Sequence, residues 1–514
     1  MKITILNEEY DINTQIFGLE HKALENLPIE IGNLINLQEL CLSNNKLKNL
    51  PIEIGNLINL KGLNLLFNQL QSLPAEISNL INLQELNLSN NQLKNLPIEI
   101  GNLINLEYLN LSNNQLKNLP VEISYLINLE YLNLSNNKIK ALPAEISGLI
   151  NLITLNLSYN RLQSLPIEIG SLCNLKHLYL FHNQLNNLPT EISNLSNLQK
   201  LDLSNNRLQS LPTGINNLIN LNELNLSINQ LKNLPISIGN LYNLKDLYLF
   251  DNQLSNLPAE IGNLLNLQKL HLYINQFKNF PTEICNLINL KELIFLNNQL
   301  DNLPIEIGNL INLKELNLSN NKLQSLPAEI NNLINLEYLK LENNILSNIP
   351  KEIGNLINLN ILNLSINELN YLPAEIYNLI NLHSLYLHTN KLICLSSEIS
   401  NLIKLENLHL SNNKLQDLPV EICNLNNLKI LYLLNNQLQY LPTEFLKIKN
   451  RLFIDNTSYN INNLNIDNEI LIFYELRKKI KISNLPFNTK EIWLKSNIKN
   501  FDIKLPFGCV IKYY

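Results

Sequence analysis

Apolar residues and asparagines recur along this chain of 514 residues with a period of 23. Eighteen rows, marked by one asparagine each from Asn45 to Asn436, follow one another without an insertion. Each row approximates the pattern LxxLxLxxNxLxxLPxEIxNLxN. A fixed period of this length predicts a repeat protein in which every row packs against its neighbours.

The spacing of apolar residues changes within each row, and it predicts two kinds of element. Leu63 and Leu65 alternate with Asn64, as the pleat of a short strand requires. Further on, four apolar residues at spacings of four, three and three form one helical face: Leu73, Ile77, Leu80 and Leu83. The second segment is short enough to be a single helical or 3-10 turn.

The residues around this predicted helix agree with its direction. Pro74 suits the first helical position, where no backbone N–H is needed, and Glu76 falls in the first turn, where the helix dipole favours an anion. The asparagine at row position nine lies between leucines. As a buried amide, we expect it to bond with backbone groups of its own row and of the adjacent row.

One row cannot bury its leucines alone, so the rows must stack. This predicts a single curved α/β solenoid, a horseshoe or superhelix, with one parallel sheet on the concave side and short helices or 3-10 segments on the convex side. Strands are expected near Leu63, Leu86, Leu109 and every 23 residues onward. Eighteen strands about 4.8 Å apart give an inner surface on the order of 85 Å long, which favours a macromolecular ligand.

The two ends of the chain depart from the repeat and divide it into three parts. Residues 1–36 hold a degenerate first repeat and are interpreted as an N-terminal cap, and residues 37–450 hold the eighteen repeats. Residues 451–514 are interpreted as a C-terminal cap, with a separate effector module as the alternative. Within this last part the sequence predicts an amphipathic helix over Asn468–Lys481 and two divergent repeat turns, at Leu485-Pro486 and Leu505-Pro506.

The row LPxEIxNLxNLxxLxLxxNxL resembles the 23-residue repeats of the Ras-group intracellular leucine-rich-repeat proteins, over about residues 14–450. Seventeen of eighteen rows keep the proline and sixteen keep the glutamate. The resemblance implies a non-catalytic scaffold that binds a protein partner on its concave face. The alternative is a substrate-recognition subunit or effector of a ubiquitin-ligase-type system, with catalysis supplied elsewhere.

Charge and cysteine spacing restrict the class of partner and the compartment. A net charge of −6 gives no basic footprint, so nucleic acid and anionic membranes are not expected partners. The N-terminus lacks the apolar core of a signal peptide, and no run of about 18 apolar residues occurs. The six cysteines are far apart and form no CxxC pair, so we expect reduced thiols and an intracellular, cytoplasmic protein.

Catalytic and metal-binding patterns are weak, so the sequence predicts neither an enzyme nor a cofactor or small-molecule site. The glutamates recur once per row, whereas an acid–base pair depends on one location. Cys509 could serve as a ligase nucleophile, but about 64 residues beyond the repeats are too few for that catalytic domain. His388 and His409, on neighbouring predicted strands, are the remaining candidates for a metal, and a metal is not expected there.

Departures from the usual strand residues indicate where a partner binds. Positions five and seven of the row, filled mostly by Asn and Ser as in Asn87 and Ser89, are expected to point outward. Larger side chains replace them in rows ten to twelve and sixteen to eighteen, at Tyr248, Phe250, His271, Tyr273, Ile294, Leu296, Tyr386, His388, His409, Tyr432 and Leu434. Exposed aromatic clusters are typical of interface centres, which makes these residues the candidate partner-binding site. The alternative is repeat drift, in which neighbouring rings merely pack on each other.

Overall fold

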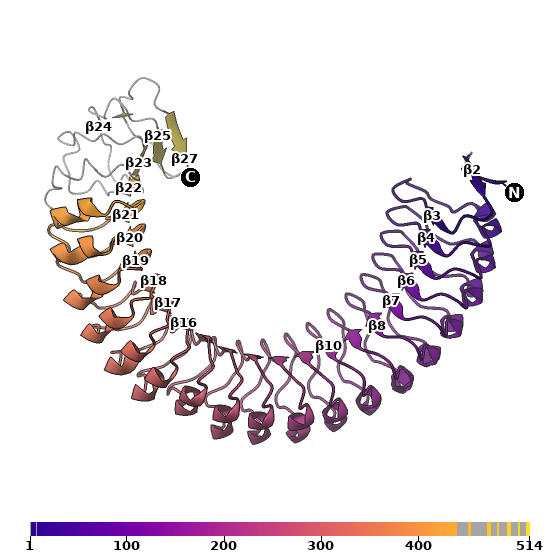
Figure 1. Cartoon of the computed structure of the whole chain (residues 1–514), viewed down its shortest axis with the longest axis horizontal. Helices are drawn as coiled ribbons and strands as arrows, with labels where there is room; N and C mark the ends of the chain where they lie inside the picture. The colour runs from indigo at the N-terminus through magenta and orange to yellow at the C-terminus, as the bar shows by residue number, and fades with distance from the viewer. Residues whose placement is uncertain are drawn as a thin grey trace. The chain divides into compact units, whose positions relative to one another are not determined.

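The computed structural model describes residues 2–6 and 8–438, together with strands at 451–453, 470–473, 481–482, 491–494, 502–503 and 510–513. The chain divides into two compact units, Met1–Leu267 and Gln268–Tyr514. In each unit, parallel strands line the inner side of an arc and short 3-10 helices line its outer side (Figure 1). Each unit therefore has the predicted solenoid architecture, with a parallel concave sheet.

The first unit opens with an antiparallel hairpin, β1 (Lys2–Ile5) and β2 (Glu8–Asp11), which the repeat pattern does not predict. Its parallel sheet then consists of β3 (Ile16–Gly18), β4 (Glu39–Cys41), β5 (Gly62–Asn64), β6 (Glu85–Asn87), β7 (Tyr108–Asn110), β8 (Tyr131–Asn133), β9 (Thr154–Asn156), β10 (His177–Tyr179), β11 (Lys200–Asp202), β12 (Glu223–Asn225) and β13 (Asp246–Tyr248). The 3-10 helices are η1 (Ile29–Asn33), η2 (Ile52–Asn56), η3 (Ala75–Asn79), η4 (Ile98–Asn102), η5 (Val121–Tyr125), η6 (Ala144–Gly148), η7 (Ile167–Ser171), η8 (Thr190–Asn194), η9 (Thr213–Asn217), η10 (Ile236–Asn240) and η11 (Ala259–Asn263).

The second unit repeats this arrangement. Its parallel strands are β14 (Lys269–His271), β15 (Glu292–Ile294), β16 (Glu315–Asn317), β17 (Tyr338–Lys340), β18 (Ile361–Asn363), β19 (Ser384–Tyr386), β20 (Asn407–His409), β21 (Ile430–Tyr432), β22 (Arg451–Phe453), β23 (Ile470–Phe473), β25 (Glu491–Leu494) and β27 (Val510–Tyr513). The helices are η12 (Thr282–Asn286), η13 (Ile305–Asn309), η14 (Ala328–Asn332), η15 (Lys351–Asn355), η16 (Ala374–Asn378), η17 (Ser397–Asn401) and η18 (Val420–Asn424). A separate parallel pair joins β24 (Lys481–Ile482) and β26 (Asp502–Ile503).

The leucines set the register of the sheet and form its core. Strands β4 to β21 are three residues long with a leucine at the centre, and this leucine pairs with the leucine 23 residues away, as Leu63 does with Leu86 and Leu86 with Leu109. The predicted strand centres are therefore confirmed. The row leucines Leu80, Leu83 and Leu86 are completely buried, because stacked repeats cover them on both sides.

The outer segment of each repeat is a 3-10 helix of five residues. In η2 the amide of Ile54 donates to the oxygen of Pro51 at 3.1 Å, and Leu57 donates to Ile54 at 3.2 Å. The proline has an extended backbone and precedes the helix, as at Pro74 before η3, so its predicted place at the first helical position is wrong. Glu76 does lie in the first turn, as expected.

The asparagine at row position nine joins two repeats through its side chain. Asn137 donates from Nδ2 to the backbone oxygens of Leu111, at 2.9 Å, and of Leu134, at 3.1 Å. Its Oδ1 accepts from the backbone nitrogen of Leu116 at 2.9 Å. Leu134 belongs to its own repeat and the other two residues to the preceding one, so the predicted structural role of this asparagine is confirmed.

The residue before this asparagine has a left-handed backbone in every repeat. Its φ lies between 52° and 58° in the eighteen repeats, a region that asparagine tolerates better than other non-glycine residues do. Asn90 follows this preference, but Ile228, Ile274 and Ile366 have the same φ. A β-branched side chain in this region of φ strains the backbone, so isoleucine at this position lowers the stability of these repeats.

The strands beyond residue 450 correct one prediction. The helix expected over Asn468–Lys481 is wrong, because Ile470–Phe473 is strand β23 and pairs in parallel with β22 and β25. The predicted repeat turns at Leu485-Pro486 and Leu505-Pro506 lie outside the described residues, and the strands β25 and β27 further on pair with each other in parallel. The short apolar run ILIF fits a strand as well as a helix, and the pairing with neighbouring strands decides between them.

Among the residues that the structure describes, none of the helices has the length or the apolar character needed to cross a membrane.

Replacing Asn137 with alanine is expected to lower the free energy of unfolding by at least about 2 kcal/mol, because buried backbone groups of two repeats lose their partner. Urea denaturation followed by circular dichroism measures this. Asn128→Ala is the matched control, since this exposed amide makes one bond, to Ile104 at 2.9 Å, and its loss is expected to cost less than about 1 kcal/mol. Equal losses would contradict the structural role of the buried asparagine.

Replacing Ile228 with asparagine is expected to raise the free energy of unfolding by about 1 kcal/mol, because asparagine tolerates the φ of 54° at this position. The reverse change, Asn90→Ile at a φ of 57°, is expected to lower it by a similar amount. Both are measured by urea denaturation. A stabilising Asn90→Ile or a destabilising Ile228→Asn would show that backbone strain does not govern this position.

Candidate functional site

The concave surface of each unit is formed by the first and third residues of the strands. Glu85 and Asn87 flank the buried Leu86 in β6, and the next strand follows the same pattern. Row positions five and seven were predicted to point outward, whereas the first strand residue, at row position three, was not included in that prediction. At position seven the serines are not outward: Ser89 is 3% exposed, and its hydroxyl donates to Oδ1 of Asn87 at 2.6 Å.

Three predicted site residues form a stack of rings on the concave sheet of the second unit. Tyr386, His409 and Tyr432 are paired in register on β19, β20 and β21. The ring centroids of Tyr386 and His409 lie 4.7 Å apart, and those of His409 and Tyr432 lie 4.2 Å apart. Each ring is half-buried, so the stack presents ring edges and faces to the concave side.

Two further predicted residues complete this group, which we call the Tyr386 cluster: Tyr386, His388, His409, Tyr432 and Leu434. His388 is half-buried and its ring centroid lies 6.5 Å from that of His409. Among the described residues no group of three or more His, Cys, Asp or Glu side chains is arranged to hold a metal ion. Leu434 is also half-buried.

Burial lowers the pKa of the His409 imidazole to about 4 from its ordinary value of 6.5, with a smaller contribution from the neighbouring His388. The pKa of His388 is also lowered, again by burial, and the carboxylate of Glu342 opposes this. Both imidazoles are therefore neutral at pH 7. The Tyr386 cluster is an uncharged, amphipathic surface, able to pack against apolar groups and to exchange hydrogen bonds at its edges.

The predicted residues of rows ten to twelve are divided between the two units. Tyr248 and Phe250 belong to the first unit and are half-buried. His271, Tyr273 and Leu296 belong to the second and are also half-buried. Nε2 of His271 lies 2.8 Å from Oε1 of Glu292.

Ile294 corrects the expectation of an exposed patch in these rows. It occupies the third position of β15 but is only 7% exposed, so it offers little surface to a partner. Its neighbours in register on the adjacent strands are His271 and Asn317. For the other predicted residues of rows ten to twelve, a role in binding a partner stays a prediction.

Sequence reasoning missed an aromatic pair on the first unit. Tyr108 and Tyr131 occupy the first positions of β7 and β8, and their rings are stacked with centroids 4.6 Å apart and planes 4° from parallel. Burial, followed by the neighbouring Tyr108, raises the pKa of Tyr131. The signal was present in the sequence, as a tyrosine replacing the more usual charged residue just before the strand leucine in two successive rows.

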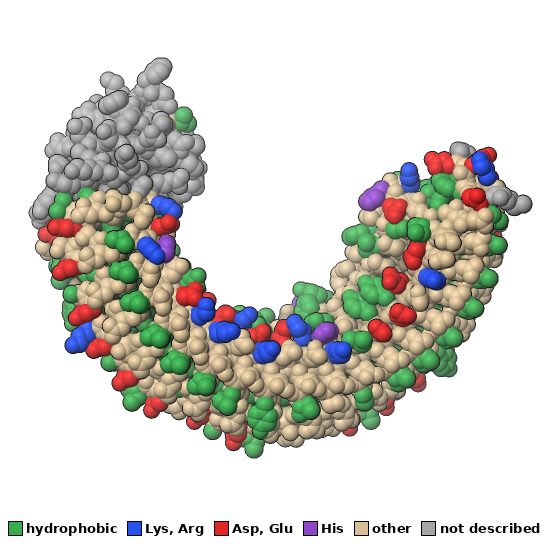
Figure 2. Space-filling model, viewed as in Figure 1, with side chains coloured by type: hydrophobic (Ala, Val, Ile, Leu, Met, Phe, Trp, Pro, Cys, Tyr) green, Lys and Arg blue, Asp and Glu red, His purple; other side chains and the backbone are tan. Residues whose placement is uncertain are grey.

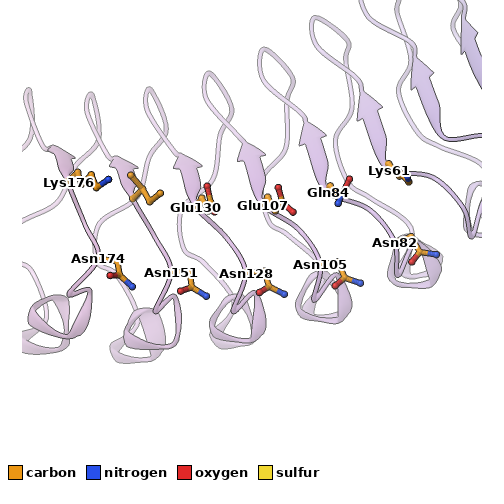
Figure 3. Close-up of a pocket in the computed structure, with 11 residues that line it drawn as sticks. Lys61, Asn82, Gln84, Asn105, Glu107, Asn128, Glu130, Asn151, Asn174 and Lys176 are labelled. Carbon is orange, nitrogen blue, oxygen red and sulfur yellow. The ribbon is translucent and has the colours of Figure 1, made fainter. Parts of the chain in front are cut away.

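A groove of about 670 Å³ runs along the flank of the first unit, beside the start of the strands (Figure 3). We call it the asparagine groove. It is lined by Lys61, Asn82, Gln84, Asn105, Glu107, Asn128, Glu130, Asn151, Ile153, Asn174 and Lys176. The five asparagines belong to the last position of the row pattern, and Figure 3 shows their amides in a file along the groove.

The asparagines of this groove bond to the preceding repeat. Asn105 donates from Nδ2 to the oxygen of Ile81 at 2.8 Å, and Asn128 donates to Ile104 at 2.9 Å. A second asparagine thus bridges repeats, this time near the surface. The side chains of Glu107 and Glu130 lie alongside this file and are exposed.

The inner face next to the groove is hollowed where β5 begins with a glycine. The hollow is lined by residues that include Glu39, Gly62, Glu85 and Tyr108. A Cβ at Gly62 would overlap the carboxylate of Glu39, so the glycine provides the room for this side chain. Burial, followed by the carboxylate of Glu85, raises the pKa of Glu39.

The described cysteines carry no arrangement that activates a thiol. Cys41, Cys173, Cys285 and Cys394 are free. Burial raises the pKa of the Cys285 thiol to about 12, so it stays protonated. Cys509, the ligase nucleophile considered from the sequence, lies outside the described residues.

The stacked strands and 3-10 helices, with side chains displayed on a concave sheet, define the class of α/β solenoid repeat proteins. A family profile described as a leucine-rich repeat region matches residues 94–172, 163–279, 230–326 and 325–409, and a second, described as a leucine-rich repeat, matches 36–57, 82–103 and 404–425. The chain belongs to the leucine-rich-repeat family. Proteins of this family generally mediate protein–protein interactions.

Solved structures of this family are similar over most of the chain. A leucine-rich-repeat protein of Leptospira interrogans is 45% identical, with a TM-score of 0.65, and the alignment covers 69% of this chain and 90% of that one. YopM from Yersinia enterocolitica is 28% identical, with a TM-score of 0.61 and coverage of 84% and 89%. The Arabidopsis receptor kinase HAESA is 28% identical, with a TM-score of 0.64 and coverage of 90% and 87%. No curated protein sequence shows significant similarity to the chain.

Acidification is expected to destabilise the second unit through His409. Between about pH 4 and pH 6.5 the unfolded chain binds a proton on this imidazole and the folded protein does not, so the free energy of unfolding falls as the pH is lowered through this range. Replacing His409 with phenylalanine removes this contribution. The difference in unfolding free energy between variant and wild type should therefore shift in favour of the variant from pH 7 to pH 4, in parallel urea titrations. An identical pH dependence in the two proteins would contradict the burial of a neutral His409.

Proposed function

We propose that this protein is a non-catalytic interaction protein that binds a protein partner on its concave face. The observation that carries the proposal is the Tyr386 cluster, in which three rings on adjacent strands are held half-buried, uncharged and in register. The preceding repeat places Asn363 at the same strand position, and asparagine is the commonest residue there, so the aromatic side chains are a local departure from the repeat. Aromatic groups of this kind supply most of the binding energy in protein interfaces.

The size and chemistry of the surface support a macromolecular partner. The concave sheet of each unit extends over many strands, whereas a small molecule needs one enclosed pocket. One of the similar proteins, HAESA, was solved in complex with the peptide hormone IDA and the co-receptor SERK1. A peptide or an extended segment of a protein is therefore a suitable occupant. Nucleic acid, membranes and small molecules are not among the partners we propose, given the acidic charge of the chain.

The more specific assignments belong to the same proposal. The 23-residue row favours the Ras-group intracellular scaffolds within the leucine-rich-repeat family, and the free thiols agree with an intracellular, cytoplasmic location. A substrate-recognition subunit of a ubiquitin-ligase-type system is the alternative. It would use the same concave face, with catalysis supplied by another protein.

Loss of the Tyr386 cluster is expected to weaken partner binding by about tenfold or more. The variant carries Tyr386→Ala, His409→Ala and Tyr432→Ala, which remove the stacked rings without touching the leucine core. Partners are captured with the whole protein as bait, identified by mass spectrometry, and their affinities for each variant are measured by biolayer interferometry.

The matched control removes three side chains from the outer helices of two of these repeats and of the repeat before them, through Glu375→Ala, Glu398→Ala and Glu421→Ala. It is expected to retain wild-type affinity. Circular dichroism establishes that both variants are folded. If the ring variant keeps every partner at full affinity while Tyr248→Ala, Phe250→Ala or Tyr273→Ala loses them, the interface lies at rows ten to twelve. If both ring variants keep them, the concave face is not the binding surface.

A further inference from the structure

The middle of the asparagine groove presents hydrogen-bond acceptors. Asn105 and Asn128 each use one N–H of the side-chain amide within the chain, donating to Ile81 and Ile104, and their amide oxygens are acceptors. Beside this file of amides lie the carboxylates of Glu107 and Glu130, which accept hydrogen bonds only (Figure 3). A ligand for this stretch must therefore donate hydrogen bonds, and a positive charge strengthens them.

The second unit shows which group satisfies these acceptors. At the asparagine equivalent to Asn128, Nζ of Lys404 donates to Oδ1 of Asn381 at 2.7 Å. At the position equivalent to Glu107, the carboxylate of Glu337 pairs with the ammonium of Lys314 at 2.9 Å. Here the chain supplies its own lysine side chains to the same two kinds of acceptor.

The first unit offers these acceptors without the cations. Gln84 occupies the position of Lys314, and Ile153 occupies the position of Lys429, which pairs with Glu406 at 2.7 Å. Asn151 holds the position of Lys404. Neither Glu107 nor Glu130 forms an ion pair within the described part of the chain. Lys61 and Lys176 line the two ends of the groove, two repeats away from the nearer carboxylate. They confine the cation-binding stretch to the middle repeats.

The stacked pair of Tyr108 and Tyr131 adjoins this stretch, because each tyrosine directly follows one of the two glutamates. Aromatic faces attract cations, and arginine stacks on them better than lysine does. The repeats that carry the unpaired carboxylates thus also carry this half-buried pair of rings on the neighbouring concave sheet. The groove extends over several repeats spaced by about 5 Å, a length that suits an extended peptide strand.

We propose that the asparagine groove of the first unit binds the lysine or arginine side chains of an extended, basic segment of a partner protein, centred on Glu107 and Glu130. This inference rests on the proposed function and adds the chemistry of the partner. Its binding surface is separate from the Tyr386 cluster, so the two can be tested independently.

Fluorescence anisotropy with the full chain tests this inference. The probes are three fluorescein-labelled peptides of eight residues, in which serine alternates with arginine, with glutamine or with glutamate. The arginine peptide is expected to bind saturably, and added salt is expected to weaken it. The other two peptides are expected to bind at least about tenfold more weakly, since they lack the positive charge.

The decisive variant is Glu107→Gln with Glu130→Gln, which removes two charges at nearly constant size. It is expected to weaken the arginine peptide by about tenfold or more. The control is Glu122→Gln with Glu145→Gln, which makes the same change on the outer helices η5 and η6 and is expected to alter the affinity by less than about twofold. A fourth peptide, in which lysine replaces arginine, tests the rings. Tyr108→Leu with Tyr131→Leu is expected to weaken the arginine peptide more than the lysine peptide.

Equal losses of affinity for the arginine peptide in the groove and control variants would overturn the inference. The peptide would then be attracted by the total charge of the chain alone. The inference would also be overturned if the arginine peptide did not bind the wild-type chain, or if it bound the groove variant with unchanged affinity. These outcomes leave the proposed function untouched if captured partners still depend on the Tyr386 cluster. Retention of every partner by both ring variants, with peptide binding intact, would instead refute the proposed function and keep the groove.

Discussion

The buried asparagine at row position nine is the constraint on which the rest of the structure depends. Its amide is bonded to backbone groups of two successive repeats, at distances near 3 Å in Asn137. No other uncharged side chain of this length carries both donors and an acceptor in this geometry. Since every repeat uses it, the loops between strand and helix are fixed one relative to the next. The leucines then need only fill the space that remains.

Because the buried asparagines and leucines hold the repeats together, the side chains on the concave sheet can vary. The repeat requires buried leucine, asparagine and a residue that tolerates a left-handed backbone, whereas the first and third strand residues vary more. Where the third is asparagine it supports the turn that follows, as Asn87 accepts from the backbone nitrogen of Ser89 at 3.1 Å. Ile228 and Ile274 keep a strained backbone with exposed side chains, and Ile366 keeps one with a half-buried side chain, which is unexpected for residues that contribute to stability alone. The rings of the Tyr386 cluster and of the Tyr108–Tyr131 pair are departures of the same kind on the concave sheet. Figure 2 shows that hydrophobic side chains also recur on the flank of each unit, so exposure alone does not identify an interface.

Most of the fold could be predicted, because a period of 23 constrains strand, helix and asparagine together. The helix expected at Asn468–Lys481 failed where the period is lost, since only pairing with β22 and β25 decides that ILIF is a strand. The site was predicted in part. Periodicity located Tyr386, His409 and Tyr432 on adjacent strands, but it could not show that Ser89 and Ile294 are buried by their neighbours. The groove depends on which acceptors the chain leaves unpaired, and spacing does not reveal that.

The central claim is that partners are bound by the concave departures from the repeat, and tyrosine footprinting tests it most directly. The whole protein is oxidised by hydroxyl radicals with and without its captured partner, and each tyrosine is quantified by mass spectrometry. We predict protection of concave tyrosines, Tyr386 and Tyr432 or Tyr108 and Tyr131. Tyr125, Tyr242 and Tyr371, which are 58–60% exposed, should be oxidised equally in both samples. Protection of these three with unchanged concave tyrosines would contradict the account.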